Sequence, residues 1–212
     1  MQEYKGALMR FSFFLAFLGM AIIVAASNFL VQFPLNAKLF SIDLSNILTL
    51  GAFTYPIAFL VTDLSNRYFG AKKARQVVLI GFAIAVIWSI YLASPRIAIA
   101  SGTAFLLAQF LDISIFDRLR ASKWWQAPLI SSFFGSLLDT ILFFGIAFSA
   151  KFTFIDNFFG SKDGSLAFSV PFLDIGFMTP LWVSLAAGDF MVKILVALLL
   201  LLPYRYLFKR KF

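Results

Sequence analysis

The sequence predicts an all-α integral membrane protein with six transmembrane helices and with both termini in the cytoplasm. Of its 212 residues, 61% are hydrophobic and only 13% are charged, whereas a soluble domain carries about 25% charged residues. The apolar residues form long continuous runs and lack the period-two alternation of transmembrane β-strands. A soluble core of this size cannot bury so much apolar surface, so we expect the lipid bilayer to surround the chain.

Six apolar runs are long enough to cross about 30 Å of hydrocarbon as helices, which takes roughly 20 residues each. Polar or charged residues bound every run, and the second run is the shortest and carries Pro56 near its middle. No linker or shift in composition divides the chain, so we expect a single domain. The predicted spans lie near residues 11–31, 47–63, 77–93, 97–116, 127–149 and 177–202.

The distribution of Lys and Arg predicts the orientation of these helices, because cytoplasmic loops of membrane proteins are enriched in basic residues. The formal charge of +8 therefore reflects topology and contact with anionic lipid, and no nucleic acid partner is expected. The basic side, predicted to be cytoplasmic, carries Lys5, Arg10, Arg67, Lys72, Lys73, Arg75, Arg118, Arg120, Lys123, Arg205, Lys209, Arg210 and Lys211. The opposite loops carry Lys38, Arg96, Lys151 and Lys162.

The first run also resembles a cleaved signal peptide in part. Lys5 and Arg10 precede it, and the small residues 25–27 follow its apolar centre, as at a cleavage site. The apolar run nevertheless continues to Val31, which favours an uncleaved transmembrane helix.

Polar side chains inside the runs are the candidates for function, because each is costly in hydrocarbon unless it faces a cavity or a partner. Asn28, Gln32 and Asn36 recur every four residues, although Pro34 is expected to end the helix before Asn36, which we place in a loop. Asn28 and Gln32 are either substrate contacts, since amides both donate and accept hydrogen bonds, or bonds between helices.

The second span combines a helix interruption with polar residues. Pro56 cannot donate a hydrogen bond to the Ala52 carbonyl, and transporters tolerate such interruptions where they line a cavity. Tyr55 and Asn66 fall near the same face as Thr62, so we expect them to contact substrate. Asp63 lies near the cytoplasmic end, where it either has a functional role or serves as a helix cap or in an ion pair with Arg67.

The fourth and fifth spans each carry a carboxylate. Gln109 and Asp112 lie in the fourth, with Asp112 toward its cytoplasmic end. Asp139 lies in the middle of the fifth span, beside a stripe of small residues and with no basic neighbour on its own helix. A carboxylate at that depth must be protonated, paired with a distant cation or exposed to water. We therefore expect Asp139 to contact the substrate or carry a proton.

The last span holds Asp189 and Lys193 one helical turn apart, so the two can pair along the helix. Lys193 can instead reach Asp139 on the neighbouring helix. A structural ion pair and a coupling role are both consistent with this spacing.

The longest connection, residues 150–176, is predicted to be external. Several Phe residues precede a polar turn cluster at residues 160–164, which indicates a short helix at the membrane interface followed by a loop. This segment either anchors the protein at the interface or closes over a site as a lid.

The residue types that are absent exclude several chemistries. The chain has no Cys and no His, which excludes thiol chemistry, structural zinc, His-ligated haem and Ser–His or Cys–His nucleophiles. The acidic residues are scattered over several helices, so we expect no metal site, no cofactor, no catalytic residue and no enzymatic activity.

Three motifs of the predicted second, fourth and fifth spans are distinctive. Residues 51–67 read GAFTYPIAFLVTDLSNR, followed by Phe69-Gly70 and Ala74-Arg75. Residues 108–117 read AQFLDISIFD, with Trp124-Trp125 beyond, and residues 131–140 read SSFFGSLLDT. These motifs resemble the queuosine precursor transporter family, which is also called the vitamin uptake transporter family. The likeness extends roughly from Phe11 to Leu202, and Asp139 stands at the family's acidic position in its helix.

The resemblance implies a bacterial inner-membrane, multi-pass importer of 7-cyano-7-deazaguanine and 7-aminomethyl-7-deazaguanine for tRNA queuosine modification. It also implies a six-helix fold similar to small vitamin-binding membrane subunits. A deazaguanine edge offers N–H donors to a carboxylate and a carbonyl to an amide donor, and aromatic rings can stack on its plane. The predicted substrate contacts are Asn28, Gln32, Tyr55, Asn66, Gln109 and Asp139, and the predicted coupling or ion-pair residues are Asp63, Asp112, Asp189 and Lys193.

The energy source is left open by the sequence. No Gly-x-x-x-x-Gly-Lys-Ser/Thr loop for ATP occurs in the chain, so transport is facilitated, ion-coupled or driven by a separate ATPase partner. The alternative function is therefore the substrate-binding membrane subunit of an energy-coupled vitamin importer. The sequence also leaves open whether the protein forms a homodimer.

Overall fold

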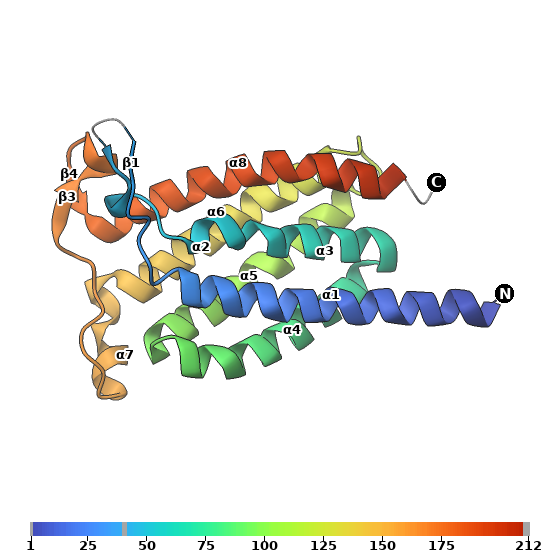
Figure 1. The fold of residues 1–212 in the computed structure, drawn as a ribbon, viewed down its shortest axis with the longest axis horizontal. Helices are drawn as coiled ribbons and strands as arrows, with labels where there is room; N and C mark the ends of the chain where they lie inside the picture. Colours follow the sequence, from blue (N-terminus) through green and yellow to red (C-terminus); the bar gives the residue numbers. More distant parts are fainter. Residues whose placement is uncertain (1, 40–41, 210–212) are drawn as a thin grey trace.

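The structure, a computed structural model, describes residues 2–39 and 42–209, most of which are helical. Long helices run side by side along the long axis of the molecule (Figure 1). The α-helices are α1 (Gln2–Leu30), α2 (Gly51–Thr54), α3 (Pro56–Phe69), α4 (Ala71–Leu92), α5 (Pro95–Leu119), α6 (Gln126–Phe148), α7 (Thr153–Phe158) and α8 (Leu181–Lys209).

Short elements connect the helices at one end of the bundle. Strands β1 (Lys38–Leu39) and β2 (Ile42–Asp43) pair antiparallel, as do β3 (Ser169–Pro171) and β4 (Met178–Pro180). Three 3-10 turns complete the fold: η1 (Leu44–Asn46), η2 (Ala150–Phe152) and η3 (Phe172–Asp174).

Both chain termini lie at the opposite end from these strands (Figure 1). The turns near residues 70 and 120–125, which are rich in basic residues, lie at the end that holds the termini. Helix α7 and both hairpins lie at the other end. Arg210 and Lys211, which the sequence analysis assigns to the basic side, lie outside the described residues.

Four helices of the described part of the chain are long and apolar enough to cross a membrane: Phe13–Leu30, Pro95–Leu119, Gln126–Phe148 and Leu181–Leu207. The predicted second and third spans fall on α2–α3 and on α4, which are not among these four. Helix α3 alone has 14 residues, fewer than the roughly 20 that a straight crossing needs. The count of six spans therefore stays a prediction.

Two helices begin later than the sequence pattern suggested. Residues 47–50 form a loop before α2. The Leu35 N–H donates a hydrogen bond to the Leu48 carbonyl at 2.9 Å, which holds this segment outside the helix. Residues 178–180 form β4 instead of the first turn of α8, since they pair with β3. At the other end, α8 continues through Pro203 to Lys209.

Gly70 forms the turn that reverses the chain between α3 and α4. Its φ is +84°, a left-handed conformation that glycine adopts without the steric cost a Cβ brings. Its N–H donates to the Asn66 carbonyl at 2.9 Å, which ends α3. This turn lets α4 pack back along α3 and α1.

The surface of the molecule is more apolar than that of a soluble protein. Large apolar side chains such as Ile141, Leu199 and Leu202 point outward with 60–70% of their surface exposed. Between the helices, clusters of buried apolar residues lie beside buried Asp, Asn, Gln, Ser and Lys side chains. A bilayer favours an apolar exterior and polar groups that find their partners inside the bundle, which is where the candidate functional groups lie.

Candidate functional site

An ion cluster lies at the centre of the bundle between α6 and α8. The Lys193 Nζ is 2.8 Å from Asp139 Oδ2 and 2.6 Å from Asp189 Oδ2. All three side chains are at least 95% buried. Lys193 therefore forms both of the pairs that the sequence offered as alternatives, one along its own helix and one across to α6.

Tyr55 joins this cluster from the junction of α2 and α3. Its hydroxyl donates to Asp139 Oδ1 at 2.7 Å, and Lys193 Nζ lies 4.8 Å from the centre of its ring. Pro56 begins α3 immediately after Tyr55, so the helix interruption predicted from the sequence falls beside the cluster. Tyr55 thus satisfies one carboxylate oxygen and contributes a cation–π contact.

Thr140 completes the hydrogen bonding of the cluster. Its hydroxyl donates to Asp189 Oδ2 at 2.9 Å and lies 3.2 Å from Lys193 Nζ. With both carboxylates ionised, the cluster carries one positive and two negative charges. Such a group holds a net negative charge in a low-dielectric interior, which favours a ligand that donates hydrogen bonds.

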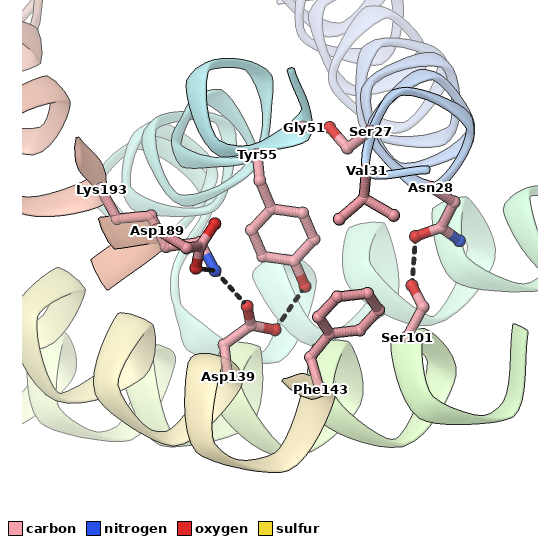
Figure 2. Close-up of a pocket in the computed structure, with 10 residues that line it drawn as sticks. All are labelled: Ser27, Asn28, Val31, Gly51, Tyr55, Ser101, Asp139, Phe143, Asp189 and Lys193. Atoms are coloured by element: carbon pink, nitrogen blue, oxygen red, sulfur yellow. Dashed lines mark hydrogen bonds and ion pairs between the residues drawn. The ribbon is translucent and has the colours of Figure 1, made fainter. Parts of the chain in front are cut away.

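A small cavity borders this cluster, as Figure 2 shows. Its volume is about 20 Å³, room for about one water molecule, whereas pockets that hold small ligands measure about 300–1,000 Å³. The cavity is lined by Ser27, Asn28, Val31, Gly51, Tyr55, Ser101, Asp139, Phe143, Asp189 and Lys193.

Asn28 forms the other polar wall of the cavity, on α1. Its Nδ2 donates to Ser89 Oγ at 2.7 Å, and its Oδ1 accepts from Ser101 Oγ. Val31 and Phe143 lie between this amide and the Tyr55–Asp139 pair (Figure 2). The cavity therefore offers a carboxylate, an amide and aromatic faces within one space.

Five of the predicted residues thus line a single cavity: Asn28, Tyr55, Asp139, Asp189 and Lys193. Gln32 does not, because its side chain is exposed at the end of α1 and its Nε2 lies 3.4 Å from the Asn28 carbonyl. The four-residue spacing placed Gln32 on the correct face, but α1 ends at Leu30, and the turn that follows carries Gln32 away from the cavity.

The other four predicted residues gather in a second buried cluster between α3 and α5. Thr62 Oγ1 donates to Gln109 Oε1 at 2.5 Å, and Asn66 Nδ2 donates to the Ile113 carbonyl at 3.2 Å. Asp63 and Asp112 are buried on α3 and α5 at the level of these two bonds. Asn66 and Gln109, predicted as substrate contacts, therefore do not line the Asp139 cavity.

Arg96 and Asp156 form a buried ion pair that the sequence pattern did not reveal. Arg96 Nη1 lies 2.6 Å from Asp156 Oδ2, and the Arg96 guanidinium also donates to the Ile146 and Ser149 carbonyls. Arg96 is 1% exposed, although its place between two apolar runs indicated an exposed loop charge. No local pattern identifies its partner, since Asp156 is 60 residues away in sequence.

This ion pair fixes α7 against the end of α5 and α6. The aromatic side chains Phe154 and Phe158 on α7 point outward, and 82% of the Phe158 surface is exposed. Beyond α7, hydrogen bonds from the Ser165 backbone and hydroxyl hold the pKa of Asp163 below its ordinary value. The exposed rings are suited to an interface anchor, while closure of this segment as a lid stays untested.

Within the described residues, no three acidic side chains lie close enough together to hold a metal ion. The Asp139 cavity instead contains its own cation, Lys193. A bound organic group that donates hydrogen bonds fits this donor and acceptor set.

Comparisons with known proteins place the chain among transporters. A family described as "Putative vitamin uptake transporter" matches residues 49–94 and 87–208. The "Probable queuosine precursor transporter" of Haemophilus influenzae is 33% identical over 229 residues, which cover 95% of this chain and 86% of the relative. The "Queuosine precursor transporter" of Escherichia coli K12 is 33% identical over 205 residues, covering 86% of this chain and 79% of the relative. No solved structure gives a significant match.

Proposed function

The chain belongs to the vitamin uptake transporter family, and from that premise we propose that it imports 7-deazaguanine precursors of queuosine across the bacterial inner membrane. The substrates are 7-cyano-7-deazaguanine and 7-aminomethyl-7-deazaguanine, moved without chemical change. The names of the relatives support the transporter class. The observation that carries the site is the buried cavity in which Asp139, Tyr55, Lys193 and Asn28 meet.

The donor and acceptor pattern of the cavity fits the edge of a deazaguanine. The ring N–H and amino groups of the base donate in parallel to one carboxylate, as Asp139 or Asp189 offers. The base carbonyl accepts from Lys193 or from the amide of Asn28. The rings of Tyr55 and Phe143 lie in the same cavity and supply flat faces for stacking.

Substrate binding requires the cavity to open, since about 20 Å³ is too small for a bicyclic base. The cavity is expected to open where α1 and α2 meet. At this junction Gly51 closes the cavity by packing directly on Val31, because an added Cβ at Gly51 would lie 2.9 Å from Val31. Separation of α2 from α1 widens the cavity next to Tyr55 and leaves the α6–α8 ion cluster in place.

The proposed membrane orientation places the end that holds both termini in the cytoplasm. Six segments cross: α1, α2 with α3, α4, α5, α6 and α8. The basic residues within 71–75, at the start of α4, and within 118–123, at the end of α5 and in the following turn, then face anionic lipid on the cytoplasmic side. Helix α7 and the two hairpins face the outside.

Queuosine content in tRNA tests the function directly. Cells unable to synthesise the precursors receive a low external concentration of each one, with and without this protein. We expect queuosine to be restored only when the protein is present, and the effective precursor identifies the substrate. No restoration by either precursor, with the protein detected in the membrane, would overturn the proposed substrate.

The Asp139→Asn variant tests the site in the same assay. We expect import to fall at least tenfold, since Asn keeps the shape but loses the charge that accepts two N–H donors. Asp117→Asn is the matched control, because Asp117 is half exposed beyond this cavity and pairs with Arg120 at 3.5 Å. Full import by Asp139→Asn would contradict the assigned role of Asp139.

A further inference from the structure

A second cluster of buried carboxyl groups lies between α3, α5 and α6, and the proposed substrate site does not use it. Asp63 and Asp112 are 3% and 0% exposed, and the Thr62–Gln109 and Asn66–Ile113 hydrogen bonds hold them at the same level of the two adjacent helices α3 and α5. Among the described residues, neither carboxyl forms an ion pair with Lys or Arg. Ser131 on α6 donates to Asp63 Oδ1 at 3.4 Å.

The cationic and titratable neighbours of this pair are engaged elsewhere. Arg67, one turn beyond Asp63 on α3, donates to the Tyr204 hydroxyl at 3.0 Å and to the Arg120 carbonyl at 2.9 Å. Arg120 in turn donates to the Asn66 carbonyl. These contacts place Arg67 close enough to influence Asp63 electrostatically, but they direct its guanidinium toward α8 and the α5–α6 turn.

Several buried polar atoms around the pair have no hydrogen-bond partner in the described part of the chain: Asn66 Oδ1, Gln109 Nε2, Ser136 Oγ and both carboxyl oxygens of Asp112. Buried polar groups are nearly always satisfied by protein or by water. Ser136 and Asp63 also line a second cavity of about 20 Å³, together with Ser132 and Tyr204. The cluster therefore has unused hydrogen-bonding capacity beside room for about one water molecule.

We propose that Asp63 and Asp112 form a proton-binding site that couples transport to the proton gradient. Two neighbouring buried carboxylates without a cation partner cannot both carry a charge in a low-dielectric interior, so the pair holds one proton. Water in the adjacent cavity exchanges that proton with the solvent. The coupling role rests on the proposed transport function, whereas the shared proton does not.

The same helices connect this site to the Asp139 cavity. Asp63 follows Tyr55 by eight residues, and Ser131 precedes Asp139 by eight, which is about 12 Å along each helix. Between the two sites, the Phe59 ring packs onto Gly135, where an added Cβ would lie 2.7 Å from Phe59 Cε1. Loss of this proton leaves two negative charges on the adjacent helices, which pushes α3 from α5 and moves Tyr55 relative to Asp139.

Infrared spectroscopy of the purified protein tests the proton site without any substrate. We expect the carbonyl band of a protonated carboxylic acid at neutral pH, and we expect it to be absent from the Asp63→Asn/Asp112→Asn double variant. The Asp117→Asn variant is the control and keeps the band. A double variant with the same band as the parent protein would overturn the proposal.

Uptake by proteoliposomes tests the coupling. An inward proton gradient is expected to concentrate 7-cyano-7-deazaguanine about tenfold per pH unit for one proton per substrate. The double variant is expected to exchange substrate across the membrane but to reach no concentration ratio above one. Retained accumulation, or accumulation that follows a sodium gradient and ignores pH, would overturn coupling at this site. Failure of the parent protein to exchange substrate would count against the proposed function, and the infrared result would still decide the proton site.

Discussion

At the scale of single residues, Lys193 holds the centre of the bundle together. Its Nζ pairs with two buried carboxylates from different helices, Asp139 at 2.8 Å and Asp189 at 2.6 Å. Replacing only the buried cation of such a cluster strongly lowers folding stability, because its two carboxylates then stay in a low-dielectric interior without compensation. The same residue therefore sets both the stability of the cluster and the hydrogen-bonding character of the cavity.

The Lys193→Met variant is predicted to be strongly destabilised. We expect it to lose about 3–5 kcal/mol of folding stability, since Asp139 and Asp189 remain buried without a cation. Thermal unfolding in detergent measures the loss, with Lys73→Met, at an exposed position on α4, as the control. Adding Asp139→Asn and Asp189→Asn to Lys193→Met is expected to recover most of the stability but no import. A single variant that unfolds like the parent protein would contradict this role of Lys193.

The Tyr55→Phe variant isolates one hydrogen bond. It keeps the ring beside Lys193 but removes the hydroxyl that donates to Asp139 at 2.7 Å. We expect a loss of about 1.5–3 kcal/mol, which is typical of a hydrogen bond to a charged group, and weaker import at low substrate concentration. Unfolding in detergent and the tRNA assay measure the two effects. Unchanged values in both assays would refute the contribution of this hydroxyl.

At the scale of elements, close packing against glycine fixes the outer ends of the helices around the cavity. Gly51 on α2 faces Val31 at the end of α1, and Gly188 on α8 faces Ile47 in the loop before α2. An added Cβ at Gly188 would lie 2.1 Å from the Ile47 carbonyl oxygen. Gly188 is next to Asp189, so the loop before α2 rests directly above the ion cluster.

The Gly188→Ala substitution is predicted to displace that loop from α8. We expect lower thermal stability and faster exchange of substrate, because the loop that contains Ile47 can no longer pack against α8 over the ion cluster. Gly145→Ala on α6 is the matched control, since no atom lies within 4 Å of its added Cβ, and alanine favours helix over glycine by up to about 1 kcal/mol. Equal behaviour of the two variants would show that the Ile47 contact does not close the cavity.

At the scale of the whole molecule, the two ends of the bundle differ in charge and in structure. Both termini and the basic turns lie at one end, and the hairpins and α7 lie at the other (Figure 1). The two hairpin regions also contact each other, since the Asp43 N–H donates to Asp174 Oδ2 at 2.8 Å. The hairpin regions therefore form one connected structure at their end of the bundle. The opposite end, which carries the termini and the basic residues, is suited to a cytoplasmic lipid surface.

Labelling of single cysteines tests this orientation, and the natural absence of Cys makes every introduced thiol unique. A membrane-impermeant maleimide applied to intact spheroplasts is expected to label Lys162→Cys but not Ser122→Cys, both at exposed positions. Permeabilised cells provide the control, in which both variants react. Labelling of Ser122→Cys in intact spheroplasts would reverse the proposed topology.

Much of the fold follows from local sequence. Apolar runs located α1, α5, α6 and α8, because a helix in lipid must carry apolar side chains along its whole length. The ends of helices were less predictable. Residues 47–50 and 178–180 are apolar enough for a helix, but backbone bonds to distant segments hold them in a loop and in β4.

The individual polar residues inside the bundle could be predicted from the sequence. Their separation into the Asp139 cavity and the Asp63–Asp112 cluster could not. The cost of a charge in hydrocarbon singles out Asp63, Asp112, Asp139, Asp189 and Lys193 from sequence alone. Sequence order does not say which helices are neighbours. Only the packing of α6 on α8 brings Lys193 to Asp139, and only the packing of α3 on α5 sets Asp63 against Asp112.

Composition and local motifs were thus sufficient to predict the membrane class, the family and most of the polar residues that the bundle buries. The tertiary structure decided which of those residues share a cavity, and it revealed the buried Arg96–Asp156 pair. The physical reason is that burial and pairing depend on contacts between helices far apart in the chain. No local pattern encodes those contacts.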